Sequence, residues 1–107
     1  MKRGEIWTLR DKHYASKARP VIVIQSDEHS SFDSVILCLF TTYESSSVTT
    51  RVFVKASQEN GLIKDSFVMT DKIVTVDKSV LGERIGRLSD EEMASVSEQL
   101  KVVLALE

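Results

Sequence analysis

The chain is poor in the residues that build disulfides and metal sites. Its 107 residues include one cysteine, Cys38, and two histidines, His13 and His29, which lie in separate polar stretches. A lone cysteine cannot close an internal disulfide, so the composition favours a reduced, cytoplasmic location. Neither histidine has a second ligand at the spacing that zinc sites use. We therefore expect no metal and no cofactor.

Glycine, proline and long apolar runs are also scarce. The four glycines are dispersed and form no phosphate-binding loop, and no Gly-x-Ser-x-Gly motif occurs, which excludes the usual nucleotide-binding enzymes and the commonest serine hydrolases. The longest purely apolar run, residues 35–40, has six residues, and a membrane-spanning helix needs about 20. The basic N-terminus is not followed by the apolar segment of a signal peptide. We expect no association with a membrane.

Charge is unevenly distributed along the chain, although the formal net charge is only −2. Residues 1–19 hold six basic and two acidic side chains, whereas residues 82–107 hold three basic and six acidic ones. The N-terminal segment is therefore suited to face an anion. The alternative is that these are scattered surface charges.

Strand patterns dominate the first three quarters of the chain. Alternating or continuous apolar and β-branched residues predict strands at 5–10, 21–25, 35–41, 48–55, 66–69 and 73–76. Residues 11–18 are polar and basic and predict a loop, and residues 26–33 predict a turn-rich connection. The turn within 42–47 predicts a hairpin between the strand at 35–41 and the one at 48–55.

The C-terminal segment is helical by its pattern. Ser89 with Glu92 three residues later forms a capping box, and Met93, Val96 and Leu100 begin an apolar face that continues to Val103 and Leu104. We predict one domain over residues 1–107, mainly β with a C-terminal helix (α+β), as a small bent sheet or partly open barrel with the helix packed on it.

Polar residues at strand ends are the best candidates for a site. Arg19 precedes Pro20 at the entrance of the apolar strand, where a proline at the first position removes no ladder hydrogen bond, and Thr41 follows six apolar residues. If the strands at 21–25 and 35–41 are antiparallel neighbours, Arg19 meets Thr41. A guanidinium and a hydroxyl at one place can hold a phosphodiester. A surface ion pair for Arg19 and a purely structural Thr41 are the alternatives.

Several motifs in order resemble one known family. They are residues 3–7 (Arg-Gly-Glu-Ile-Trp), 19–25 (Arg-Pro-Val-Ile-Val-Ile-Gln), 65–68 with 75–78, and 85–88 followed by Met93 and Val96. Together they are similar to the MazF/PemK toxins of bacterial toxin–antitoxin pairs, over nearly the whole chain. The resemblance implies an SH3-like, PemK-type barrel, a homodimer and a metal-independent endoribonuclease that cuts single-stranded RNA at short sequences. It also implies an antitoxin whose acidic, disordered tail occupies the RNA groove.

The resemblance also implies site residues. The essential arginine of the family matches Arg19, and its strand-end threonine or serine matches Thr41. Some members use an acidic residue on the later strand, where Asp71 stands, but the arginine that they carry two residues earlier is Met69 here. His13 falls in a region where some members use a histidine.

The chemistry of RNA defines the remaining roles. The 2′-hydroxyl can attack the adjacent phosphorus and leave a 2′,3′-cyclic phosphate and a 5′-hydroxyl, so the enzyme needs positioning, a proton acceptor and a cation. The candidate proton acceptors are Glu5, His13 and Asp71. Further candidates for RNA contact are Thr42, Lys17, Tyr14 and Lys72, and Trp7, Tyr14 and Phe53 are candidates for stacking on bases.

The sequence is also compatible with two other functions. Gyrase-binding toxins of the CcdB type share the architecture without nuclease activity, but they depend on a Trp-Gly-Ile ending, whereas this chain ends in Leu104-Ala105-Leu106-Glu107. A catalytically inactive SH3-like binding module is the other alternative, and the presence of both Arg19 and Thr41 argues against it.

Overall fold

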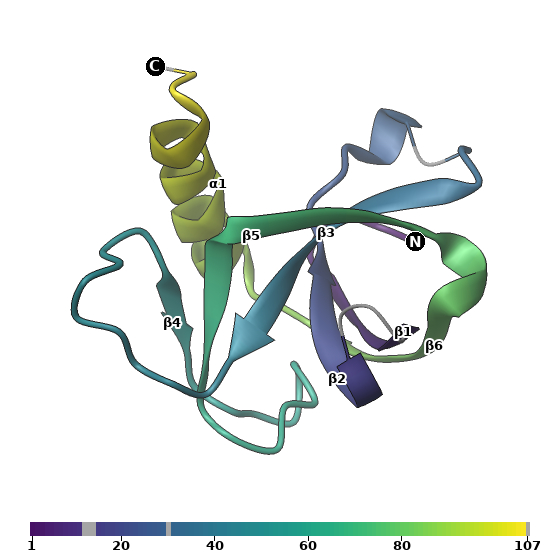
Figure 1. The fold of residues 1–107 in the computed structure, drawn as a ribbon, viewed down its shortest axis with the longest axis horizontal. Helices are drawn as coiled ribbons and strands as arrows, with labels where there is room; N and C mark the ends of the chain where they lie inside the picture. The colour runs from purple at the N-terminus through teal and green to yellow at the C-terminus, as the bar shows by residue number, and fades with distance from the viewer. Residues whose placement is uncertain (12–14, 30, 107) are drawn as a thin grey trace.

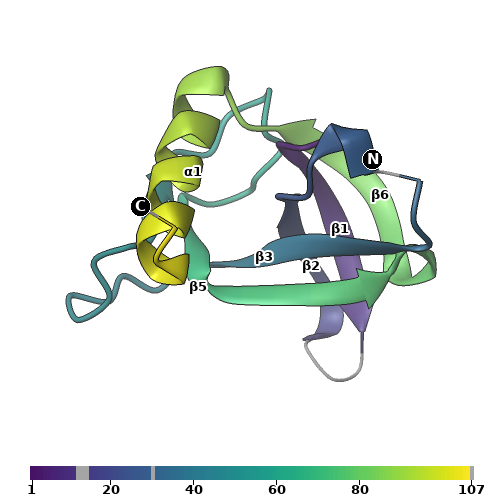
Figure 2. The ribbon, with the colours of Figure 1, turned by 90° about the horizontal axis from the view of Figure 1, so that it is seen from above.

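A computed structural model describes residues 1–11, 15–29 and 31–106. One antiparallel sheet of six strands in the order β4-β5-β3-β2-β1-β6 curls around the core, and one α-helix packs against it (Figure 1). The strands are β1 (Glu5–Asp11), β2 (Ala15–Val23), β3 (Ser34–Thr41), β4 (Val52–Val54), β5 (Ser66–Asp77) and β6 (Leu81–Arg87). Figure 2 shows β3 and β5 side by side, with β1 and β2 crossing them. The predicted α+β class and curled sheet are confirmed.

The central strands separate two groups of buried side chains. Ile6, Ile22 and Cys38 belong to the cluster on the helix side, whereas Leu9 and Val21 belong to the other cluster. Neighbouring residues of a strand point to opposite faces, so each strand contributes to both clusters. This explains the continuous apolar runs. Burial also raises the pKa of the Cys38 thiol to about 12, as expected for a core side chain rather than a reactive one.

The helix forms as its sequence predicts. α1 (Asp90–Leu104) begins after Ser89, whose hydroxyl accepts from the Glu92 backbone N–H at 3.1 Å while the Glu92 carboxylate accepts from the Ser89 N–H at 2.9 Å. Val96 and Leu100 are buried in the core, but Leu104 is half exposed. The apolar face of the helix is therefore buried only over its first three turns.

The predicted start of the second strand is wrong. β2 begins at Ala15, inside the segment predicted as a loop, because Ala15 pairs with Asp11 of β1. Pro20 therefore lies inside β2 and not at its start. It is tolerated there because pairing with β3 begins only at Val21.

The predicted hairpin between the strands at 35–41 and 48–55 does not form. β4 covers only Val52–Val54 and pairs with β5, which lies between β4 and β3 in the sheet. The strand segments predicted at 66–69 and 73–76 are one strand, β5, interrupted by a bulge opposite Cys38 and Leu39. β6 is a further strand that the sequence pattern did not predict.

Short 3-10 turns complete the connections. η1 (Asp27–His29) lies between β2 and β3, and η2 (Lys78–Val80) joins β5 to β6. None of the helices in the described part of the chain is long and apolar enough to cross a membrane.

Candidate active site

Strand pairing brings Arg19 and Thr41 to one place. The pairing of β2 with β3 ends where Val21 faces Leu39, and Arg19 and Thr41 lie two residues beyond this pair, each on the same face of its strand as the paired residue. Both residues line one hollow of about 180 Å³. Its other lining residues are Leu9, Pro20, Val21, Leu39, Phe40 and Met69. The exposed Arg19 cation and the Thr41 hydroxyl thus lie in a hollow whose other lining residues are apolar.

The Arg19 side chain is exposed and available to a ligand. Among the described residues, the four ion pairs all involve other cations. A guanidinium is always charged at neutral pH and offers five N–H donors in a planar fork. Arg19 can therefore bind an anion without first breaking an ion pair to a described carboxylate.

Thr41 has a hydroxyl that is already oriented. Its Oγ1 accepts a hydrogen bond from the Tyr43 backbone N–H at 3.1 Å. A hydroxyl has one donor and two acceptor positions, so this bond leaves the O–H free to donate. The geometry suits donation to an oxygen of an anion held by Arg19.

Asp71 is held by a second arginine that the sequence analysis did not single out. Arg51 Nε donates to Asp71 Oδ1 at 3.0 Å and Nη2 donates to Oδ2 at 3.1 Å. These hydrogen bonds lower the pKa of the Asp71 carboxyl. Asp71 lies in the β5 bulge. Met69 before the bulge faces Leu39 of β3, and Ile73 after it faces Cys38. A carboxylate with a lowered pKa and both oxygens engaged is a weak proton acceptor.

Glu5 lies at the other end of β1 from the hollow. Ile6 pairs with Ile22 and Leu9 with Arg19, so about 13 Å of strand separates Glu5 from the level of Arg19. Burial favours a higher pKa for Glu5, but hydrogen bonds from Lys2 N–H and Trp7 Nε1 and the charge of Arg84 outweigh it and lower the pKa. The structure therefore does not bring Glu5 to Arg19.

The remaining candidates are dispersed. Thr42 is exposed and lines a different groove with Pro20 and Ile63, and Lys72 is exposed in the β5 bulge. The predictions for His13 and Tyr14 lie outside the described residues, and the Lys17 side chain lies outside the described side chains. Within the residues that are described, no cluster of three or more His, Cys, Asp or Glu side chains could hold a metal ion.

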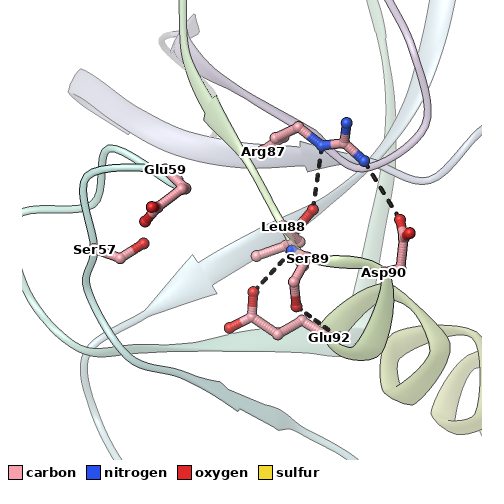
Figure 3. A pocket seen from close by; sticks show the side chains of 7 residues that line it. All are labelled: Ser57, Glu59, Arg87, Leu88, Ser89, Asp90 and Glu92. Carbon is pink, nitrogen blue, oxygen red and sulfur yellow. Dashed lines mark hydrogen bonds and ion pairs between the residues drawn. The ribbon is translucent and has the colours of Figure 1, made fainter.

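A larger hollow of about 460 Å³ lies at the N-terminus of α1 (Figure 3). The Ser89 and Glu92 side chains there cap the helix, and Arg87 pairs with Asp90 at 3.4 Å. These polar groups bind one another across the β6–α1 junction. The hollow is therefore explained by the helix cap, and Arg19 and Thr41 lie elsewhere.

The sequence matches one family of toxins over nearly its whole length. Residues 2–104 match the family model of the PemK-like, MazF-like toxins of type II toxin–antitoxin systems. The chain belongs to this family.

Individual relatives agree with this assignment. A probable endoribonuclease MazF from Mycolicibacterium smegmatis is 35% identical over 107 residues, covering 99% of this chain and 98% of the relative. Endoribonuclease EndoA of Bacillus subtilis is 33% identical over 90 residues, covering 82% and 77%. Among solved structures, the Mycobacterium tuberculosis toxin MazF-mt6 has a TM-score of 0.80 at 25% identity, covering 98% of this chain and 99% of that one. A mycobacterial endoribonuclease solved with its cognate antitoxin has a TM-score of 0.83 at 21% identity, covering 100% and 97%, which shows the shared fold.

Proposed function

We propose that this protein is a toxin that cleaves single-stranded RNA at short sequences, without a metal ion, by attack of the 2′-hydroxyl on the adjacent phosphorus. The observation that carries the proposal is that the exposed Arg19 and the hydroxyl-bearing Thr41 line one hollow. The endoribonucleases among the relatives support it, and they give no support to a gyrase-binding function.

Arg19 and Thr41 have separate roles in this reaction. A base removes the proton of the 2′-hydroxyl, the bond from the 2′-oxygen to phosphorus forms while the bond to the 5′-oxygen breaks, and the departing 5′-oxygen takes up a proton to leave as a hydroxyl. Negative charge builds on the non-bridging oxygens during this exchange. Arg19 stabilises this charge through its N–H donors. Thr41 donates its free O–H to a phosphate oxygen and keeps the phosphate in line with the attacking group.

The partners form part of the same proposal. The mycobacterial structure of this fold contains a cognate antitoxin, and we propose that an antitoxin with an acidic tail inhibits this chain by occupying the surface around Arg19. We also propose a homodimer that acts in the cytoplasm.

The decisive experiment is cleavage of a mixed-sequence single-stranded RNA by the purified protein in excess EDTA. We expect cuts at a short motif that leave 2′,3′-cyclic phosphate and 5′-hydroxyl ends. Cleavage that disappears in EDTA, or products with 3′-hydroxyl ends, would reject the mechanism. Folded protein that cuts no RNA would reject the function.

Replacing Thr41 tests the hydroxyl. Thr41→Val keeps the shape and the β-branch but removes the donor, and one hydrogen bond to a charged group contributes about 1.5–3 kcal/mol. We expect the cleavage rate to fall roughly tenfold to a hundredfold. Thr41→Ser keeps the hydroxyl and is the matched control, with activity near that of the wild type. Equal rates for the valine and serine variants would show that the hydroxyl has no role.

Replacing Asp71 tests whether it is the proton acceptor. Because Arg51 holds both oxygens and lowers the pKa of Asp71, we expect Asp71→Asn to reduce the rate less than tenfold, whereas loss of a general base costs about 10²–10⁴. The rate should be measured from pH 5 to 9 for both proteins. A drop of a hundredfold or more, together with loss of an acidic limb of the pH profile, would identify Asp71 as the base.

A further inference from the structure

Two phenylalanines form a pair beside the proposed active site. The Phe53 and Phe67 rings are 5.4 Å apart between centroids, at an interplanar angle of 62°, which is an edge-to-face contact. Phe67 is half-buried, whereas 54% of the Phe53 surface is exposed. Phe67 thus contacts a ring more than half of whose surface faces solvent.

Register places this pair in one row with Thr41. Thr41 of β3 faces Phe67 of β5, and Phe67 faces Phe53 of β4. Directly opposed residues in a sheet point to the same face, and neighbouring strands lie about 4.8 Å apart. The Phe53 backbone is therefore about 10 Å from that of Thr41, on the face that carries the Thr41 side chain.

The other two residues of β4, rather than Phe53, attach this strand to the core. Val54 is fully buried, and Val52 packs on the helix-side core. Phe53 lies between them and points to the opposite face. An aromatic ring that remains more than half exposed contributes little to the core, which leaves its surface available to a ligand.

We propose that Phe53, supported by Phe67, stacks on an unpaired nucleobase flanking the phosphate held by Arg19 and Thr41. This inference rests on the proposed ribonuclease function and adds a subsite to it. Stacking on an aromatic ring accepts any base, because every base has a π-face. This stacking platform, formed by Phe53 and Phe67, therefore adds affinity for single-stranded RNA. It does not select one base through hydrogen bonds.

The test uses Phe53→Ala with two matched proteins. Phe53→Tyr keeps a ring of the same size, and Phe32→Ala removes a ring of equal exposure, 54%. Phe32 precedes the start of β3, more than about 20 Å from Thr41 at its end. All four proteins are compared on the RNA motif mapped for the wild type. We expect Phe53→Ala to raise KM about 5-fold to 100-fold with little change in kcat, and both matched proteins to resemble the wild type.

A binding measurement tests stacking directly. The probes are uncleavable copies of the RNA with a 2′-deoxy sugar at the cut and 2-aminopurine on one side of it or the other. We expect one probe to lose fluorescence on binding the wild type and the tyrosine variant, and to keep it with Phe53→Ala. Without a mapped cut, a mixed-sequence RNA containing scattered 2-aminopurine replaces these probes.

Four results would contradict this inference or separate it from the proposed function. If Phe53→Ala had the same KM as the wild type and still quenched the probe, the proposed stacking on Phe53 would be rejected, and the proposed ribonuclease function would be unaffected. A rise in KM accompanied by dissociation of the protein in sedimentation would overturn the stacking in favour of a contact between copies of the chain. If the wild type quenched the probe but cleaved no RNA, the stacking on Phe53 would be supported and the ribonuclease function would be rejected. Neither quenching nor cleavage would reject both.

Discussion

Arg19→Ala should slow RNA cleavage by about 10² to 10³, the cost of removing one donor from a site that stabilises developing negative charge. Its folding should not change, because the side chain is exposed and forms none of the ion pairs found among the described residues. Single-turnover cleavage of a defined RNA measures the first effect, and the thermal unfolding midpoint measures the second. A normal midpoint with a reduced rate assigns the loss to chemistry rather than to structure.

Two further variants make this prediction specific. Arg10→Ala removes an exposed arginine from the neighbouring strand, where it lines a different hollow with Ser79 and Glu83, and should leave the rate within about twofold of wild type, since uncoupled surface substitutions have small effects. Arg19→Lys keeps the charge but loses the planar fork, so its rate should lie between those of wild type and Arg19→Ala. An alanine variant at Arg19 that is as active as Arg10→Ala would remove Arg19 from the mechanism.

The juxtaposition of Arg19 and Thr41 could be predicted from local sequence signals. Two apolar strands joined by a short turn-rich segment pair antiparallel by default, and this pairing brings the residues just before the apolar run of one strand close to the end of the other. The helix could be predicted for a similar reason, because the Ser89 capping box and the spacing of Val96 and Leu100 are local. In both cases the information lies within about 25 residues of sequence, where local rules hold.

The Arg51–Asp71 pair could not be predicted in this way. It depends on β4 pairing with β5 and on the bulge that displaces Asp71. Sequence order favours a hairpin between β3 and β4, because consecutive strands are usually neighbours. The opposed rings of Phe53 and Phe67 instead contribute a cross-strand contact that favours the β4–β5 pairing. The preference of β4 for β5 can be recognised only from the three-dimensional arrangement of the two strands.

β6 could not be predicted from the sequence either, in this case because of its composition. Its sequence, Leu-Gly-Glu-Arg-Ile-Gly-Arg, has two glycines and no regular apolar alternation, so its own preference for a strand is weak. It is extended because it pairs with β1 and supports the turn at residues 57–62, where the Arg87 backbone N–H donates to the Glu59 carbonyl at 3.0 Å. The edge strand is therefore specified by its neighbours.

That turn is the basis of the second large effect, which we expect for Gly61→Ala. Gly61 has φ +70°, and a Cβ there would lie 2.1 Å from the Ile85 carbonyl oxygen of β6. The turn cannot easily move away, because Asn60 is buried and its Oδ1 accepts from Ser57 and Leu62 N–H at 3.0 Å each. A positive φ costs a residue with a side chain about 1–2 kcal/mol, and we expect the clash with backbone to raise the total above about 3 kcal/mol, among the large single-site effects.

Gly4→Ala separates the two contributions, and chemical denaturation of both variants measures them. Gly4 also has a positive φ, +92°, but its Cβ would meet the flexible Met93 side chain at 3.1 Å rather than backbone. It should therefore lose about 1–2 kcal/mol, the conformational cost alone. If Gly61→Ala lost no more than Gly4→Ala, the contact between the turn and β6 would be loose. If it lost more, as we expect, the turn locks β6 against β1, and β1 in turn pairs with the strand that carries Arg19. Cleavage by Gly61→Ala should then fall together with the folded fraction.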